Sequence, residues 1–183
     1  MTIDDIFSKM GSHMVQGIMT HEQLMNCYLF LGLKGYAKCQ EYHYISETKS
    51  YVNFCRYKAN HFGSLVKSTD IVNPQIIPAT WYGSTRESVN AKTRMEAMAA
   101  ALDEWIRWEE SALSLYQESY KALLDLGDIA TADFVNEFIL DAEEELTFAR
   151  NEKLRKTSIG FDIVSVMEEQ QDWKKKYKKL LKK

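Results

Sequence analysis

Two glutamates stand where amphipathic helices usually carry apolar side chains. Glu109 lies seven residues after Leu102 and seven before Tyr116, on the apolar stripe of a segment that begins near Ala91. Steps of three, four and seven residues return to one face of an α-helix, so Glu109 shares that face. A carboxylate buried without a partner is costly, and it needs a proton, a cationic neighbour or a metal ion. The spacing therefore predicts an interior carboxylate with one of these three partners.

A second acid has the same setting further along the chain. Glu145 lies in a predicted helix that ends near Thr157, and Glu144 stands beside it, whereas Glu143 is expected to face solvent. The residues that share the face of Glu145 are apolar, small or acidic: Phe134, Phe138, Asp141, Phe148 and Ala149. Two opposed helices that each present a carboxylate to the interior can hold a metal ion. Alternatively, basic side chains from the rest of the chain neutralise the two acids.

Composition indicates the class of fold that positions these acids. The chain has 183 residues with 8 Gly and only 2 Pro, which favours an all-α protein of one domain with a short appendage. Its net charge of -3 gives no overall field toward nucleic acid or membranes.

Cysteine usage and hydropathy bear on the compartment. Cys27, Cys39 and Cys55 are odd in number and lack the spacing of a zinc site, which indicates a reducing compartment. No apolar run reaches the ~20 residues of a membrane span, and no signal-peptide pattern follows the start. We therefore expect a cytoplasmic protein that is not transmembrane.

The chain is predicted to begin with an N-terminal extension over residues 1–19. Its Gly-Ser-His-Met run at residues 11–14 matches the remnant that tag cleavage leaves in recombinant proteins. Residues 1–15 are therefore expected to be partly of vector origin and are set aside.

The first hairpin is predicted from a capping signal. Thr20 and Gln23 form a capping box, which predicts a helix from residue 20 to about 47. A turn near residues 47–50 then leads to a second helix over residues 51–69. His43 and His61 lie in these helices, and each is expected to be a surface or hydrogen-bonded residue, with metal ligation as the alternative.

A long crossover is predicted to separate this hairpin from the next one. Residues 70–90 contain both prolines of the chain but are too apolar for a floppy linker. A connection this long lets the third helix run parallel to the second, whereas short turns make neighbours antiparallel. Gly127 and Asp128 mark the turn between the third and fourth helices. The prediction is an all-α four-helix bundle over residues 20–157.

Residues 158–183 are predicted to form a basic amphipathic helix. Trp173, Tyr177, Leu180 and Leu181 recur at helical spacing on one side. Seven lysines occupy the other faces: Lys174, Lys175, Lys176, Lys178, Lys179, Lys182 and Lys183. We expect the apolar stripe to pack on the bundle or on a neighbouring subunit, with contact to an anionic surface as the alternative.

The third and fourth helices resemble those of the ferritin family. The matching residues are Trp108-Glu109 and the series Asp128, Thr131, Phe134, Val135, Phe138, Ile139, Asp141, Glu144 and Glu145. His21-Glu22-Gln23 is also similar to the Asn-Glu-Gln that opens the first helix of many ferritins. The resemblance covers about residues 20–163. It implies a ferritin-like bundle in which Glu109 and Glu145 correspond to iron ligands, with Asp141 and Glu144 beside them.

The first two helices depart from the ferritin pattern. A ferroxidase centre takes a glutamate from the first helix and a Glu-x-x-His pair from the second. An ungapped comparison places these ligands on Cys27, Asn60 and Gly63, and no Glu-x-x-His occurs in the chain. The resemblance therefore implies a degenerate di-iron centre. Three basic residues are the expected partners of the interior carboxylates: Lys34, Arg56 and Lys58.

These features support three hypotheses of function. The favoured one is a ferritin-like bundle, without ferroxidase activity or cofactor, that acts through binding or assembly as a homo-oligomer or with a protein partner. The second is an iron-binding or storage protein with a weak metal site on its third and fourth helices. The third is a protein that contacts nucleic acid or an anionic membrane surface through its C-terminal helix.

Overall fold

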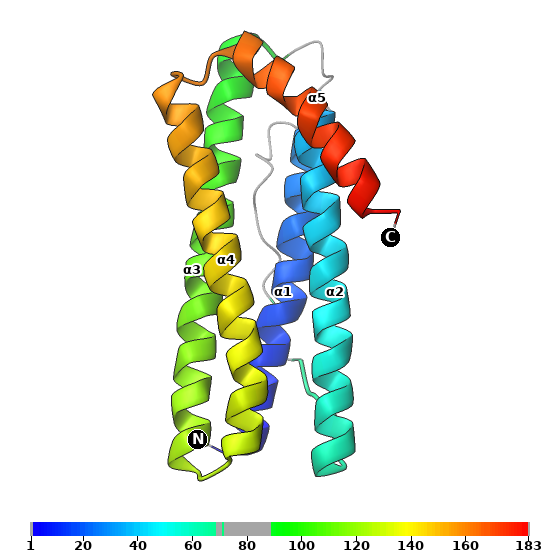
Figure 1. Cartoon of the computed structure of the whole chain (residues 1–183), viewed down its shortest axis with the longest axis vertical. Coiled ribbons are helices and arrows are strands. Elements are labelled where there is room, and N and C mark those ends of the chain that lie inside the picture. Colours follow the sequence, from blue (N-terminus) through cyan, green and yellow to red (C-terminus); the bar gives the residue numbers. More distant parts are fainter. Residues whose placement is uncertain (1, 69–70, 72–88, 183) are drawn as a thin grey trace.

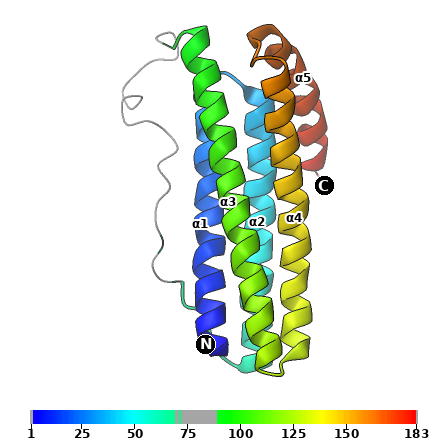
Figure 2. The ribbon, with the colours of Figure 1, turned by 90° about the vertical axis from the view of Figure 1, so that its left-hand side faces the viewer.

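The computed structural model describes residues 2–68, 71 and 89–182, and this part of the chain consists of five α-helices (Figure 1). The helices are α1 (Ile3–Phe30), α2 (Lys34–Phe62), α3 (Ala91–Asp125), α4 (Ile129–Ser158) and α5 (Ile163–Leu180). The first four lie side by side in a bundle, and α5 crosses one end of it and packs against α2 (Figure 2). The predicted all-α four-helix bundle with a short fifth helix is thereby confirmed. None of the described helices combines the length and apolarity that crossing a membrane requires.

The order and direction of the helices also agree with the prediction. α1 and α2 form one antiparallel hairpin, and α3 and α4 form the other. α2 and α3 run in the same direction along the bundle (Figure 1), which requires a connection as long as the bundle itself. The crossover predicted over residues 70–90 lies outside the described residues, apart from Ile71, Val89 and Asn90.

The N-terminal segment belongs to the bundle, so the predicted extension over residues 1–19 is wrong. Helix α1 starts at Ile3, because the Thr2 hydroxyl accepts the Asp5 N–H and the Asp5 carboxylate accepts the Thr2 N–H, which completes a capping box. Thr20 is buried in the middle of this helix and caps nothing. Four side chains of the segment are wholly buried: Ile6, Phe7, Met10 and Met14.

The first hairpin turns at Leu31–Leu33, and not near residues 47–50 as predicted. Gly32 has a φ of 78°, a left-handed conformation that costs glycine little. The Leu33 N–H donates to the Tyr28 carbonyl and the Gly32 N–H to the Leu29 carbonyl, which is the Schellman pattern of a helix end. The apolar periodicity continues on both sides of this turn, so the sequence pattern alone did not reveal it. The second hairpin turns at Gly127, as predicted, and Asp128 accepts the Thr131 N–H at 3.1 Å.

Helix α5 is fixed to the bundle by its apolar stripe and by one buried ammonium. Trp173 and Tyr177 are buried, which confirms that the stripe packs inward. Lys156 of α4 is completely buried and contacts the carboxylate of Glu169, which also accepts a hydrogen bond from the Tyr36 hydroxyl at 2.6 Å. The lysines of α5 within the described residues are exposed.

The apolar core is divided into two clusters by a polar layer. One cluster surrounds Trp105 and Trp173 near the α1–α2 turn, and the other surrounds Phe7 and Phe54 near the α3–α4 turn. Between them, all four bundle helices turn polar side chains inward, among them His21 and Glu109, which are buried. The fold therefore places ionisable groups at mid-height of the bundle, where burial makes charge costly.

The burial of the N-terminal segment leads to a stability prediction. Phe7 is 0 % exposed and stacks on Phe54 with ring centroids 4.7 Å apart. We expect Phe7→Ala to lower the free energy of unfolding by about 3–5 kcal/mol, because a large buried ring is removed and leaves a cavity. Chemical denaturation followed by circular dichroism measures this change.

Leu140→Ala is the matched control, because Leu140 is 58 % exposed and the substitution should change stability by less than about 0.5 kcal/mol. Equal stability of the Phe7→Ala variant and the unsubstituted protein would contradict the packing of α1.

Candidate metal centre

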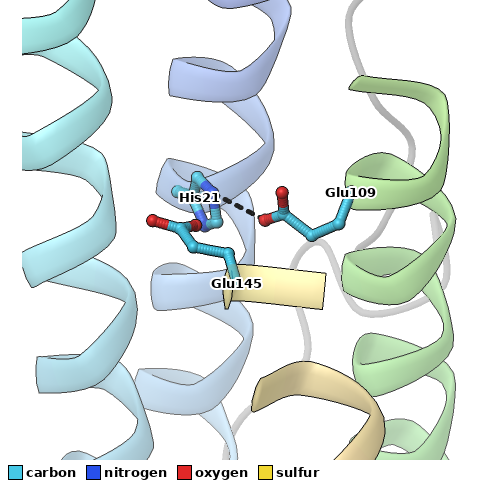
Figure 3. A group of neighbouring side chains, drawn as sticks. All are labelled: His21, Glu109 and Glu145. Carbon is cyan, nitrogen blue, oxygen red and sulfur yellow. Dashed lines mark ion pairs between the residues drawn. The ribbon is translucent and has the colours of Figure 1, made fainter. Parts of the chain in front are cut away.

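Four helices bring histidines and carboxylates together at mid-height of the bundle. His21 comes from α1, His43 from α2, Glu109 from α3 and Glu145 from α4. One donor atom each of His21, Glu109 and Glu145 lies within 4.8 Å of the other two. Figure 3 shows these three side chains pointing toward one another from three separate helices. This spacing allows all three to reach one small cation.

His21 is oriented by an amide. Its Nδ1 lies 2.8 Å from Oε1 of Gln40, a carbonyl oxygen that can only accept, so Nδ1 carries the proton. The Nε2 lone pair then faces Glu109, whose Oε1 is 3.8 Å away. Burial lowers the pKa of His21 to about 4, so the ring is neutral near pH 7. A neutral imidazole with one nitrogen tied to a carbonyl and the other directed at a carboxylate has the orientation of a metal-ligating histidine.

Glu109 is buried, with 2 % of its surface exposed. Its Oε1 accepts a hydrogen bond from the indole Nε1 of Trp105, one helical turn earlier, at 2.9 Å. Burial raises the pKa of Glu109 well above its usual range, and the neighbouring carboxyl groups of Glu145 and Glu47 raise it further. Without a metal ion, burial therefore disfavours the charged form of Glu109.

His43 and Glu145 form a charge pair between α2 and α4. His43 Nδ1 lies 3.1 Å from Glu145 Oε2. Burial by itself lowers the pKa of His43, but the Glu145 carboxylate, with a smaller contribution from Cys39, outweighs it, so the pKa lies well above its ordinary value. Burial acts to raise the pKa of Glu145, and the opposing effect of His43 brings it down to about 2. The pair is therefore ionic near neutral pH.

A cavity of about 350 Å³ adjoins three of the four side chains, His43, Glu109 and Glu145. Glu47 of α2 lines it, and burial raises the pKa of Glu47 to about 8. Asp141 and Glu144 also line it and are exposed at its rim. The cavity thus connects the buried cluster with solvent through an acidic lining.

Several buried polar atoms of the cluster have no hydrogen-bond partner among the described residues. They are Nε2 of His21, both ring nitrogens of His43 and Oε2 of Glu145. Although His43 Nδ1 is close to Glu145 Oε2, the contact does not have hydrogen-bond geometry. Buried polar groups are rarely left unpaired without a reason. Imidazole nitrogens and carboxylate oxygens suit iron and related divalent metals, so these residues fit a transition-metal ion.

The structure brings together some of the acids that the sequence singled out and separates others. Glu109 and Glu145 meet in the interior, whereas Asp141 and Glu144 lie at the cavity rim. Cys27 is buried in the apolar cluster near the first turn, Asn60 is exposed, and Gly63 ends α2. The ungapped comparison that placed ligand positions on these three residues was therefore out of register with the bundle.

The predicted lysine and arginine partners of the interior acids are wrong. Lys34 is exposed as the first residue of α2, since the turn precedes it, and Arg56 is exposed as well. Lys58 is buried, but its ammonium lies 2.7 Å from Asp4 and donates to the Leu65 carbonyl. The cation that faces Glu145 does come from the other hairpin, but it is His43.

Sequence reasoning missed four residues of the centre. His43 was expected to be a surface or hydrogen-bonded residue, with metal ligation as the alternative, and His21 was expected at the start of a helix. Glu47 was expected at a turn, and Gln40 was not singled out. His61 is exposed, as expected, and its Nδ1 lies 3.0 Å from the Tyr57 carbonyl. A signal for His21 was present, because Phe7, Met10, Met14, Gly17, His21, Leu24 and Tyr28 follow one another in steps of three and four.

Comparison with known proteins identifies the architecture. No family model and no curated protein sequence matches the chain. Among solved structures, an engineered closed form of the Archaeoglobus fulgidus ferritin aligns with a TM-score of 0.77 and 14% identity, over 95% of this chain and 96% of that one. A structure of the open pore ferritin from the same archaeon aligns with 0.76 and 15%, over 93% and 94%.

A further solved structure, a PmFTN variant soaked in iron, aligns with a TM-score of 0.73 and 11% identity, over 91% of this chain and 95% of that one. These likenesses extend along almost the whole chain, which includes α5. The chain therefore has a ferritin-like fold.

Proposed function

We propose that this chain is a ferritin-like bundle that binds one divalent transition-metal ion of the iron class at mid-height of its interior. The observation that carries the proposal is the convergence of His21, Glu109 and Glu145, from three helices, within 4.8 Å. His43 and Glu47 lie on the remaining helix and line the adjoining cavity, where His43 pairs with Glu145.

The chemistry of the buried groups supports this reading. The neutral His21 ring directs an unpaired nitrogen into the cluster, and burial disfavours the charged form of the Glu109 carboxyl group. A bound divalent ion would supply the positive charge that allows Glu109 to ionise and would satisfy the unpaired buried atoms. The same arrangement without an ion is energetically poor, which a purely structural role does not explain.

The donor set also supports a single ion. Among the described residues, the three donor groups lie close enough together to surround one ion. Helix α1 contributes a histidine to them instead of a bridging carboxylate. Two irons that react together with oxygen require bridging carboxylates from both halves of a bundle. We therefore retain the proposal of a centre that is degenerate relative to a di-iron ferroxidase.

We also propose that the chain forms a homo-oligomer and that α5 contacts acidic partners. The likeness of the fold to ferritins, among them an engineered closed form and an open pore form, supports a homo-oligomer. The exposed lysines of α5 offer a surface for acidic partners, with nucleic acid or anionic lipid as the alternative occupants. Light scattering tests the first point, and salt-dependent binding of DNA or anionic vesicles tests the second.

Binding of Co(II) tests the proposed centre. We expect one Co(II) ion per chain in calorimetry under anaerobic conditions, and Glu109→Gln should weaken this binding at least about tenfold, because an amide is a poor substitute for a carboxylate ligand. Glu110→Gln is the matched control, since Glu110 is the next residue, is 50 % exposed and pairs with Arg150. Equal affinities in both variants would exclude Glu109 as a ligand.

The same two variants also test the stability of the metal-free protein, where Glu109→Gln should be favourable. In the presence of a chelator, Glu109→Gln should raise the free energy of unfolding by about 1–3 kcal/mol, since it removes the cost of a buried carboxyl group and retains an oxygen for the Trp105 indole. Glu110→Gln should have little effect. Loss of stability in Glu109→Gln would show that the carboxyl group is a structural requirement.

Aerobic iron oxidation tests the single-ion proposal. We expect slow oxidation of added Fe(II) with no initial rapid phase, because the three proposed donors are expected to hold one ion. The absorbance of the ferric product reports the time course. A fast phase that consumes two Fe(II) per chain would contradict this expectation and would indicate a functional di-iron centre.

A further inference from the structure

One lysine of α5 shares the cavity of the metal centre. Lys176 lines this cavity together with Glu47, Glu144 and Glu145. Its ammonium lies 5.6 Å from the ring centroid of Phe148 and 5.1 Å from that of Tyr177, and both rings line the same cavity. The α5 lysine side chains before and after it, Lys175 and Lys178, are not part of the lining.

The position of Lys176 is set by a rigid attachment of α5. Gln170 of α5 lies six residues before Lys176, and there the α5 backbone approaches Gly35 of α2. A Cβ atom at Gly35 would stand 2.0 Å from the Gln170 carbonyl oxygen, so only glycine allows this approach. The buried Lys156 holds Glu169 from the α4 side. Trp173 and Tyr177 are buried in the neighbouring apolar cluster, and Tyr177 lines the cavity. The end of α5 is therefore fixed beside the cavity, and this places Lys176 in the cavity lining.

The charge of Lys176 is opposite to that of the remaining acidic lining. Five carboxyl groups border the cavity: Glu47, Glu109, Asp141, Glu144 and Glu145. Among the described lining residues, Lys176 and His43 are the basic ones, and His43 is paired with Glu145. No ion pair joins Lys176 to a carboxylate in the part of the chain that the structure describes. Its ammonium lies near the rings of Phe148 and Tyr177 and contributes a positive potential at the cavity.

We propose that Lys176 controls the access of divalent cations to the interior centre, and the proposal rests on the metal-binding function proposed above. A divalent ion that enters this cavity is repelled by the ammonium that lines it, because both charges are positive. The tethered ammonium therefore slows the passage of divalent ions and weakens their binding. By this account α5 sets how readily divalent ions reach the centre.

Substitutions that change the charge of residue 176 distinguish an electrostatic role of Lys176 from a steric one. In stopped-flow mixing of the full-length, metal-free protein with Co(II), quenching of tryptophan fluorescence follows binding near Trp105, which contacts Glu109. Lys176→Gln should raise the association rate constant about three- to tenfold at low ionic strength, and Lys176→Glu should raise it further. Added salt should reduce both differences.

Lys178→Gln is the matched control, because it makes the same change in net charge two residues away, at a lysine that is exposed like Lys176 but does not line the cavity. Its rate constant should stay within twofold of that of the unsubstituted protein. Thermal melts of each metal-free variant check that α5 remains attached.

The outcomes distinguish the two proposals. If the unsubstituted protein binds Co(II) and Lys176→Gln and Lys176→Glu behave like Lys178→Gln, the access role is wrong and the metal centre stands. If Lys176→Gln and Lys176→Glu accelerate binding equally, the side chain acts as a steric plug and the electrostatic proposal is overturned. If no variant binds Co(II), both proposals fail.

Discussion

Burial of Glu109 is the constraint on which the other features of this bundle depend. The carboxyl group lies in the interior, where burial holds its pKa well above the usual range. The indole of Trp105 satisfies one oxygen, and the neutral ring of His21 stands opposite without a hydrogen bond to it. Such a group is costly in a metal-free core, so the surrounding structure has to supply the stability that this layer lacks.

That stability comes from the two apolar clusters on either side of the polar layer. The cluster around Phe7 and Phe54 requires the N-terminal third of α1, and the cluster around Trp105 and Trp173 requires α5. The helices at both ends of the chain are therefore part of the frame that holds the centre. Their attachment also determines what lies over the cavity, since the end of α5 brings Lys176 to it. The packing of the core and the electrostatics of the site are linked through this helix.

The second hairpin could be predicted from the sequence, and the first could not. In α3 and α4 the apolar stripes that include Glu109 and Glu145 run without interruption, and Gly127 marks the turn between them. In the first hairpin the apolar stripe continues across Gly32. The periodicity therefore predicted one helix from residue 20 to about 47, where the structure has a turn between α1 and α2. The Gly-Ser-His-Met run within residues 1–15 resembles a tag remnant, and this resemblance concealed the start of α1.

These two errors shifted the register of the first half and hid its contribution to the centre. With the helix start at Ile3, His21 falls on the interior stripe of α1 just as Glu109 does on that of α3. With the turn at Leu31–Leu33, His43 and Glu47 lie in the middle of α2 instead of at its end. Lys34 moves to the exposed start of α2 for the same reason. Residue types alone could not correct this, because a histidine on a helix is common outside metal sites.

The central claim is that His21, Glu109 and Glu145 hold one divalent ion, and anomalous diffraction tests it most directly. Crystals of the full chain grown with Co(II) should give one anomalous peak per chain inside the bundle, about 2 Å from His21 Nε2 and from an oxygen of each carboxylate. A peak only at the cavity rim, beside Asp141 and Glu144, would contradict the account, as would two interior peaks in each chain.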